Sequence, residues 1–403
     1  MNNNYKEITN CVCCDNNFLV KVLDLQDQPL ANNNLVSKEE PEDRYPLAIN
    51  YCNECTHLQL TVAVNPDLLF KNYLYVTGTS QTMKNYLDFF VDYTLDLNPS
   101  PENVLDIGCN DGTLLDIYKE KGISTYGIDP SENLFEISSL KHNVICDYLN
   151  DSHAKIFANK FSMIIAHNVF AHTETPLEFL SNCREMLSDD GFIFIQTSQA
   201  NMVENNEFDT IYHEHISFFS IESFKVLARR AGLKLVDHIK TPLHGTSHLF
   251  ILSKNPELKE TTKTDRFKIN DKTISNYAIN VEKIAKDLRG GIEEIRSNGY
   301  KVIGYGAAAK GNTLTNYADV DFDYIIDDNP LKQGLFTPGK HCEIVPLSKL
   351  KNEYGKVCIV PLAWNFFDEI YKNCMNVLNT DDVVFVKYFP SFEVQSRKSL
   401  SND

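Results

Sequence analysis

The sequence predicts an α/β protein in which a small cysteine-bearing segment precedes two domains with parallel sheets. Five stretches with strand character alternate mostly with helical patterns, which is typical of a parallel sheet. They lie at 103–107, 124–128, 143–146, 162–166 and 191–197. A second αβ segment begins at YKVIGYGAAAKGN, residues 300–312. Because 403 residues exceed a comfortable single core, we expect two or three domains.

The segments between these features supply the domain boundaries. Aromatic residues such as Tyr86 and Phe90 recur at three-to-four spacing, so a helix is predicted over 66–100. The polar stretch 253–271 is predicted to be a linker. A long helix is expected over 273–297, with an apolar stripe of Ile274, Tyr277, Val281, Ile284, Leu288, Ile292 and Ile295. We therefore expect domains at 1–65, 66–258 and 259–403.

Composition excludes several kinds of partner. The net charge of −17 argues against nucleic acid, because phosphate backbones require clustered Lys and Arg. An anionic small molecule remains possible, since helix N-termini supply donors without net positive charge. No apolar run approaches the ~20 residues of a membrane helix, and MNNNYKEITN lacks the features of a signal peptide. We expect a soluble cytoplasmic protein without a membrane partner, as a monomer or simple homo-oligomer.

The N-terminal cysteines form two CxxC pairs. Cys11 and Cys14 make the first pair, and Cys52 and Cys55 follow after a gap of 37 residues. Four thiolates at this spacing suit a tetrahedral structural zinc ion, with no coordination position left open for chemistry. In a chain without a secretion signal, cysteines indicate metal binding or burial rather than disulfides. The alternative is four ordinary buried cysteines.

The stretch VLDIGCNDGTLLDIY, residues 104–118, reads as strand, glycine turn and helix start. Gly108 and Gly112 would let the backbone approach a ligand closely. The spacing differs from the GxGxxG of dinucleotide sites. Asp129 ends the next strand, where a ribose would be held, and Asp147 follows the strand after that. Another Rossmann-like nucleotide-binding fold remains the alternative.

This combination resembles the class I S-adenosylmethionine-dependent methyltransferases. The resemblance implies that the first loop lines the methionine end of the cofactor, that Asp129 binds its ribose and that Asp147 lies beside its adenine amino group. The lining residues would be Asp106, Gly108, Asn110 and Gly112.

The second glycine turn, VIGYGAAAKGN, has small residues that can cradle an anion, and Lys310 adds a point charge. Lys332, in the turn-rich PLKQG, is a second cation available to anionic groups. The alternative is that these glycines serve only strand-to-helix packing.

Together, the motifs resemble the nucleotide-sugar C-methyltransferases of deoxysugar pathways. They include YLYVTGTS, LDIGCNDGTLL, NVFAHT, ENNEFDTIYHEHISFFS and GYGAAAKGNT. The resemblance implies a small zinc domain, a central class I methyltransferase Rossmann-like domain and a C-terminal Rossmann-like domain. It implies S-adenosylmethionine and structural zinc as cofactors. Its substrate would be a nucleotide-linked 4-keto-deoxysugar, held between the last two domains and methylated next to the ketone, at C-3. Candidate sugar-nucleotide contacts are Gly306, Lys310, Asn312 and Lys332.

Three segments depart from that family's pattern: IQTSQANM, HGTSHL and PGKHCEI. They leave the sugar and the methylated position open, but they hardly affect the cofactor assignment.

The stretch DTIYHEHISFF, residues 209–219, carries two histidines. As a strand it would place His213 and His215 on one face and Glu214 on the other. A metal site would need a further ligand such as His172, and polar packing is a second alternative. A general base fits best, because imidazole titrates near neutral pH.

The resemblance implies that His215 removes the proton beside the ketone. Tyr212, Glu214, His172 and Tyr75 would orient the sugar or stabilise the enolate, and Asn168 is a further candidate. Three other functions remain open: O- or N-methylation of a nucleotide sugar, a metal-dependent hydrolase or lyase that uses the histidines, and a zinc-ribbon adaptor. The adaptor would leave both glycine loops unexplained.

Overall fold

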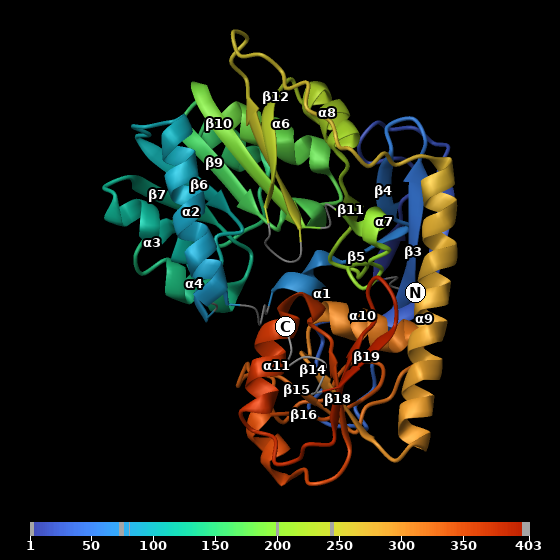
Figure 1. Cartoon of the computed structure of the whole chain (residues 1–403). Coiled ribbons are helices and arrows are strands. Elements are labelled where there is room, and N and C mark those ends of the chain that lie inside the picture. Colours follow the sequence, from blue (N-terminus) through green and yellow to red (C-terminus); the bar gives the residue numbers. More distant parts are fainter. Residues whose placement is uncertain (1–3, 72–75, 80, 199–200, 242–245, 397–403) are drawn as a thin grey trace. The chain divides into compact units, whose positions relative to one another are not determined.

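The computed structural model describes residues 4–71, 76–79, 81–198, 201–241 and 246–396 (Figure 1). The chain divides into two compact units. The first comprises Met1–Val20, Asn50–Ala200 and Glu214–Lys268, and the second comprises Lys21–Ile49, Asn201–His213 and Ile269–Asp403. The polypeptide therefore passes between the units several times, once between His213 and Glu214.

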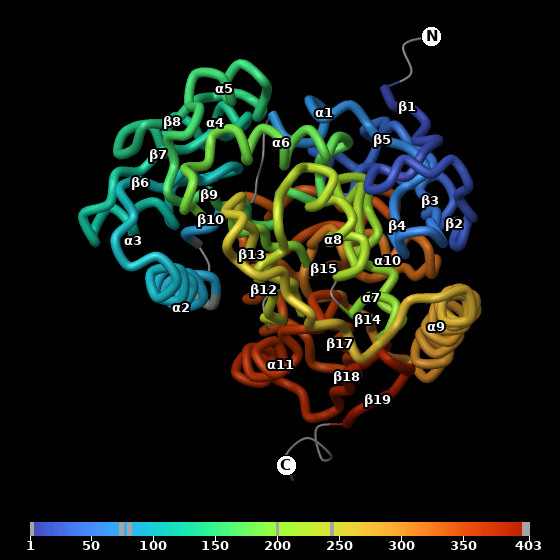
Figure 2. The backbone as a smooth tube through the Cα atoms, turned by 90° about the horizontal axis from the view of Figure 1, so that it is seen from above, coloured from blue at the N-terminus to red at the C-terminus, as the bar shows by residue number. Residues whose placement is uncertain are grey.

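The first unit is built on a seven-stranded sheet in the order β12-β13-β10-β9-β6-β7-β8. Its five parallel strands, which confirm the predicted ones, are β6 (Asn103–Ile107), β7 (Ser124–Ile128), β8 (Asn143–Ile145), β9 (Phe161–His167) and β10 (Leu187–Ser198). The antiparallel strands are β12 (Lys234–Thr241) and β13 (Ser247–Ser253). Figure 2 shows β6, β7 and β8 side by side. The strand order reverses between β6 and β9, and open α/β sheets bind ligands at such a point.

Alternate residues of these strands feed two apolar clusters, because successive side chains in a strand point to opposite faces. Val104 belongs to the cluster that holds Phe90 and Tyr118, from α2 (Gln81–Leu97) and α3 (Thr113–Glu120). Leu105 belongs to the other. That second cluster contains residues of α5 (Asp151–Ile156), α6 (Pro176–Met186) and α8 (Ile221–Arg230). Helix α4 (Glu132–Ser138) follows β7.

The prediction of one helix over 66–100 is wrong in its middle. The chain forms α1 (Pro66–Phe70), a 3₁₀ turn η1 (Thr77–Thr79) and then α2. The backbone N–H groups of Thr77 and Gly78 donate to the side chains of Asn110 and Asp111, at 3.0 and 2.9 Å. These bonds to a distant loop replace helical ones, and residue spacing could not reveal them.

The cysteine-bearing segment packs into the first unit. Strand β1 (Tyr5–Glu7) pairs with β5 (Val62–Val64), and β4 (His57–Leu60) pairs with β11 (Ser217–Phe218), both antiparallel. Cys11, Cys52 and Cys55 lie in the same apolar cluster as α6 and α8. The segment therefore shares a core with the seven-stranded domain.

The second unit contains a six-stranded sheet, parallel except for its last strand. In order, its strands are β16 (Ile344–Val345), β15 (Tyr324–Ile326), β14 (Lys301–Tyr305), β17 (Val357–Pro361), β18 (Val383–Lys387) and β19 (Glu393–Ser396). Its other main elements are α7 (Met202–Asn205), α10 (Ala309–Ala318), α11 (Phe367–Met375) and most of β2 (Val20–Pro29). Strand β3 (Arg44–Cys52) begins in this unit and continues into the first unit at Asn50. Short 3₁₀ turns are η2 (Phe170–His172), in the first unit, and η3 (Leu347–Asn352) and η4 (Trp364–Phe366), in the second.

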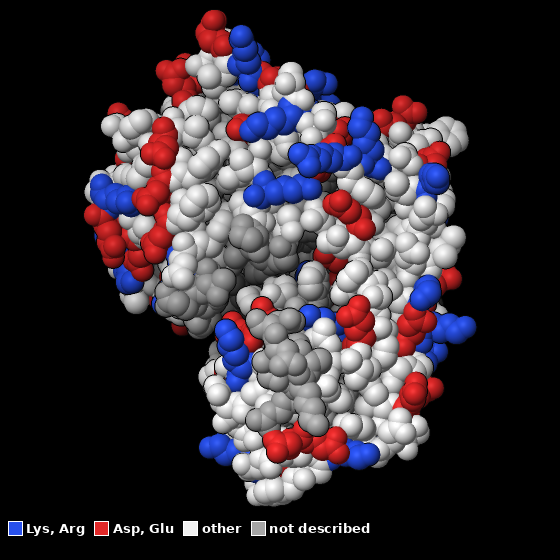
Figure 3. All heavy atoms as spheres, viewed as in Figure 1, with Lys and Arg blue, Asp and Glu red and all other residues white. Residues whose placement is uncertain are grey.

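The predicted long helix is confirmed as α9 (Asp271–Ser297), and its apolar stripe is buried. A capping box of Asn270 and Thr273 starts it, which satisfies backbone N–H groups of its first turn. Residues 254–270 have no regular structure, as a linker would. None of the helices within the described ranges could cross a membrane. Over much of the face in Figure 3, Lys and Arg stand next to Asp and Glu.

Candidate functional site

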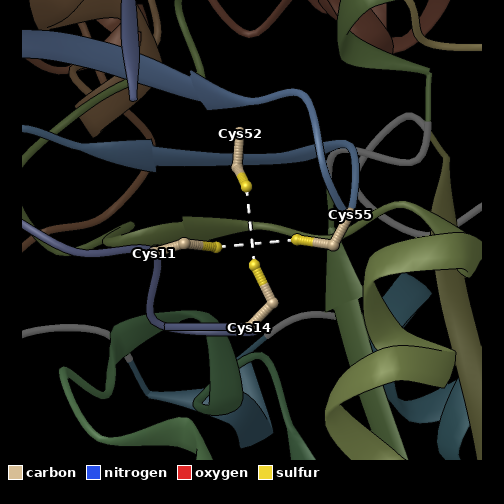
Figure 4. A group of neighbouring side chains, drawn as sticks. All are labelled: Cys11, Cys14, Cys52 and Cys55. Carbon is tan, nitrogen blue, oxygen red and sulfur yellow. Dashed lines mark hydrogen bonds between the residues drawn. The ribbon is translucent and has the colours of Figure 1, made fainter. Parts of the chain in front are cut away.

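The four cysteines of the paired motifs converge. Their sulfur atoms lie within 4.8 Å of one another, with Cys11–Cys55 and Cys14–Cys52 each at 3.5 Å, and point toward a common centre (Figure 4). Sulfur atoms around a tetrahedral zinc ion stand about 3.8 Å apart, because each Zn–S bond is about 2.3 Å long. The donor set therefore fits zinc. Cys13 is buried but does not belong to this group.

Asp129 fixes the first glycine loop. One of its carboxylate oxygens accepts the N–H of Asn110 at 2.8 Å and the other accepts that of Ser131 at 2.9 Å. Gly108 has φ of +76°, and a Cβ there would stand 2.3 Å from Val169. The position therefore requires glycine both for its backbone angle and for the approach of the loop after β9. Gly112, with φ of +81°, similarly caps the start of α3.

Asp106, at the end of β6, is 4% exposed. Burial raises the pKa of its carboxyl well above the usual value, and the negative charge of Asp129 adds to the rise. Its Oδ1 has no hydrogen-bond partner in the described part of the chain, and neither has Oδ1 of Asn168 nor Nε2 of Gln196. Such buried orphan atoms at the ends of β6, β9 and β10 fit a polar ligand at the switch point of the sheet.

Asp147 lies on the exposed rim after β8. It accepts from the N–H of Tyr148 at 2.8 Å and from the side chain of Asn150 at 3.0 Å. The residues present thus offer S-adenosylmethionine a glycine loop, a clamped aspartate after β7 and a second aspartate after β8, as the sequence predicts.

The rings of His172 and His215 stack on each other and connect to the first glycine loop through a chain of contacts. The His172 ring lies between Phe70 and His215, with both pairs of ring centroids 5.3 Å apart. Ser131, beside Asp129, donates its hydroxyl to the Phe70 carbonyl at 3.1 Å. A chain of contacts thus leads from the glycine loop to His215, which is 5% exposed. Burial lowers the pKa of His172 to about 4.

The expectation of a strand around the two histidines is wrong. Residues 209–216 form turns and loop, and only Ser217–Phe218 are extended as β11. His213 stays in the second unit, where its Nε2 lies 3.3 Å from the Tyr45 carbonyl. Burial lowers its pKa to about 4. His213 and His215 therefore do not share the face of a strand. Among the residues described, the group that could hold a metal is the cysteine cluster.

The remaining predicted catalytic residues are Glu214, Tyr212 and Tyr75. Glu214 is buried in the first unit and Tyr212 is half-buried in the second. Tyr75 lies outside the described residues.

The second glycine loop repeats the backbone pattern of the first. The Gly306 N–H donates to the Ile326 carbonyl at 2.7 Å, as the Gly108 N–H does to the Ile128 carbonyl. Asp327 accepts the N–H of Ala307 at 2.8 Å, as Asp129 accepts that of Asn110. Each glycine has positive φ, +103° at Gly306.

Two of the predicted substrate contacts are engaged within the second unit. The Asn312 amide donates to the Ala31 carbonyl at 2.7 Å, and the Lys332 ammonium to the Ala307 carbonyl at 2.7 Å. The Lys310 ammonium lies 5.5 Å from the ring centroid of Trp364, the only tryptophan in the sequence.

Sequence reasoning missed Asp111, which accepts the Gly78 N–H, and Trp364, which donates to Asp209 at 2.8 Å. No spacing signal joins either pair, because the partners lie 33 and 155 positions apart in the sequence.

We expect Cys11→Ser to lower the zinc content well below one ion per chain and to destabilise the first unit, because metal binding and folding are coupled. Elemental analysis and thermal unfolding measure both effects. Cys13→Ala is the matched control, a neighbouring buried cysteine outside the cluster, and should retain one zinc ion. Equal zinc content in the two variants would contradict the assignment.

Asp129→Ala should weaken binding of S-adenosylhomocysteine by at least about tenfold, since it removes the acceptor for two loop N–H groups and leaves them unpaired. Isothermal titration calorimetry measures this affinity. The control Asp92→Ala removes an exposed carboxylate of α2 that pairs with Lys121, the residue after α3, and should bind normally. Binding of NAD in place of the sulfur compound would overturn the cofactor assignment.

Asp106→Asn should become increasingly stable relative to wild type as pH rises above about 4, the ordinary pKa of an aspartate. The folded state holds the Asp106 proton more tightly than the unfolded chain does, so the wild type loses stability above the unfolded pKa of about 4. The asparagine cannot ionise and has no such loss. Urea unfolding of cofactor-free protein at several pH values measures the difference. A constant difference would mean that Asp106 titrates normally.

Three family models match successive parts of the chain. They are described as "Putative zinc binding domain", "Methyltransferase domain" and "C-methyltransferase C-terminal domain", and they match residues 11–70, 80–238 and 253–390. Among characterised relatives, C-methyltransferase NovU of Streptomyces niveus is 25% identical over 391 residues, which cover 91% of this chain and 92% of that protein.

Other similarities are confined to part of the chain. The ubiquinone biosynthesis O-methyltransferase of Histophilus somni is 26% identical over 106 residues, which cover 24% of this chain and 44% of that protein. A solved SAM-dependent methyltransferase from Archaeoglobus fulgidus has 20% identity and a TM-score of 0.33, and the match covers 50% of this chain and 86% of that one.

The three domain models occur in the order of the cysteine cluster, the first glycine loop and the second αβ unit, and the match to NovU runs almost from end to end. The first glycine loop, which fits S-adenosylmethionine, lies within the match to the methyltransferase domain, and the cysteine cluster, which fits a structural zinc ion, lies within the match to the zinc-binding domain. The protein is an S-adenosylmethionine-dependent methyltransferase whose three domains match these models in order and which is similar to a C-methyltransferase over nearly its whole length.

Proposed function

We propose that this enzyme methylates a nucleotide-linked 4-keto-deoxysugar at the carbon beside the ketone, C-3. The observation that carries the proposal is His215, a buried imidazole in stacked contact with His172, on a chain of contacts that begins at the cofactor loop. The nearly full-length similarity to a C-methyltransferase supports transfer to carbon. We keep the domain division 1–65, 66–258 and 259–403, and propose a cytoplasmic enzyme that is a monomer or simple homo-oligomer.

Carbon beside a ketone becomes nucleophilic only after a proton leaves it. S-adenosylmethionine, when bound, supplies an electrophilic methyl group. His215 would accept the proton from C-3, and donors would stabilise the charge on the ketone oxygen. We propose that Tyr212, Glu214 and Tyr75 orient the sugar or stabilise the enolate. His172 suits a neighbouring role, because its low pKa keeps it neutral. A second positive ring beside His215 would oppose protonation of the base.

The second glycine loop supports a nucleotide-linked substrate. It repeats the backbone pattern of a cofactor-binding loop, with Gly306 and Asp327 in the places of Gly108 and Asp129. Helix α10 begins directly after it, and backbone N–H groups at a helix start attract phosphate. We propose that Gly306 and Lys310 approach the diphosphate. Asn312 and Lys332 would act by holding the loop, since both donate to carbonyls of the same unit.

The role of His215 predicts hydrogen exchange without methyl transfer. In deuterated water with S-adenosylhomocysteine, wild type should exchange the C-3 hydrogen of a thymidine-diphosphate or uridine-diphosphate 4-keto-deoxyhexose, as followed by mass spectrometry. His215→Asn removes the base and keeps a polar side chain, so exchange and turnover should fall together by about 10²–10⁴-fold.

His213→Asn is the control, because that ring packs against Tyr45 and should matter much less. Methyl transfer by wild type without any exchange would point to an oxygen or nitrogen acceptor instead. Exchange that persists in His215→Asn would assign the base to another residue.

A further inference from the structure

The segment 201–213, which leads into His215, belongs to the second unit, while residue 214 onward belongs to the first. Several hydrogen bonds within the described part of the chain join it to the rest of the second unit. The Trp364 indole N–H donates to the Asp209 carboxylate at 2.8 Å, the Tyr277 hydroxyl to the Glu207 carbonyl at 3.1 Å, and the Thr313 hydroxyl to the Ile211 carbonyl at 3.1 Å.

Apolar contact adds to these bonds. The Phe208 ring meets Tyr317 and Phe389 edge-on, with centroids 5.4 and 5.8 Å apart, and Trp364 packs against Phe389 at 5.6 Å. Apart from α7, the segment has no regular structure of its own, since it consists mainly of turns and loop. Its conformation therefore depends on the helices α9 and α10 and on the chain around Trp364.

Asp209 is the acidic residue through which segment 201–213 bonds to Trp364. The residue is fully buried, and a buried carboxylate is costly unless donors and a cation compensate for it. Its Oδ2 accepts from Trp364, and its Oδ1 has no hydrogen-bond partner among the residues described. The Lys310 ammonium lies 5.5 Å from the Trp364 ring centroid, and its charge acts favourably on Asp209 and Glu207. Burial still leaves the pKa of Asp209 raised.

We infer that Asp209 and Trp364 are positioning residues, which fix the segment 207–213 on the second unit and thereby set the place of His215. The inference rests on the proposed function, since it concerns the residue proposed as the base. It gives the C-terminal domain a task besides substrate binding. It also assigns Lys310 a structural task, because the charge of Lys310 partly balances the two acids on this segment.

The test is Trp364→Phe, which removes one N–H donor and keeps an aromatic ring. A misplaced base should lower kcat for methyl transfer by about ten- to hundredfold, with KM for S-adenosylmethionine and for the thymidine-diphosphate 4-keto-deoxyhexose nearly unchanged. Hydrogen–deuterium exchange mass spectrometry should show faster amide exchange in peptides spanning 207–216. Asp209→Ala should have the same effects. Asp209→Asn retains an acceptor for the indole and should preserve most of kcat.

Tyr324→Phe is the matched control. It removes a hydroxyl bond to Glu353 in the same unit, away from the segment, and should affect stability without changing kcat. If Trp364→Phe lowers only the melting temperature, or loosens 207–216 with kcat intact, the positioning role is wrong. A rise in KM for the sugar nucleotide with normal kcat would also overturn it, in favour of direct substrate contact.

The proposed function can fail separately. Wild-type enzyme that methylates its substrate without exchanging the C-3 hydrogen would exclude the enolate route. The kcat and amide-exchange comparison between Trp364→Phe and Tyr324→Phe would still decide whether the segment is positioned by the second unit.

Discussion

The proposed base, His215, has to be held still, yet it lies in a loop with no helix or strand to fix it. Its neighbours in the sequence therefore have to be anchored at both ends. On the C-terminal side, the Leu60 N–H donates to the Ile216 carbonyl at 2.9 Å, and β4 pairs with β11 at once. On the N-terminal side, residues 207–211 bond to the second unit. The stack with His172 fixes the ring itself.

The zinc site can contribute to anchoring the loop that carries His215. The knuckle that carries Cys52 and Cys55 leads directly into β4, the strand that pairs with β11. The Thr56 and Ser220 hydroxyls add a bond of 2.8 Å across the same junction. A four-residue strand gains little stability alone, so a metal ion that closes the preceding turn stabilises the pairing at small cost in chain length. Through the pairing of β4 with β11, the zinc ion would thus help to hold the loop that carries His215.

The two αβ domains solve one local problem in the same way. A glycine turn between strand and helix leaves N–H groups with no intrahelical partner, and an aspartate from the next strand accepts one of them. Asp129 and Asp327 perform this task. In the first domain a second acid, Asp106, lies buried beside the clamp and raises the local cost of negative charge. A cationic ligand relieves that cost, and S-adenosylmethionine carries a sulfonium and an ammonium group.

The sequence by itself determined the features that depend on local pattern. Paired CxxC spacing predicted the convergent sulfurs of Cys11, Cys14, Cys52 and Cys55, and alternating strand and helix patterns predicted β6 to β10. The apolar period predicted α9, because a helix of 27 residues must bury one continuous stripe. Strand ends also predicted where Asp129 stands, since parallel strands bring their carboxyl ends to one edge of the sheet.

Only the tertiary structure decided what depends on bonds between distant segments. The helix expected over 66–100 is interrupted because Thr77 and Gly78 bond to Asn110 and Asp111. The histidine stretch is a loop although its residues favour strands, because its flanks are tied to β4 on one side and to Trp364 on the other. The spacing of apolar residues in the sequence indicates which side chains are buried. It carries no information about which remote carbonyl or carboxylate satisfies a given N–H, and those pairings hold the loops of this protein.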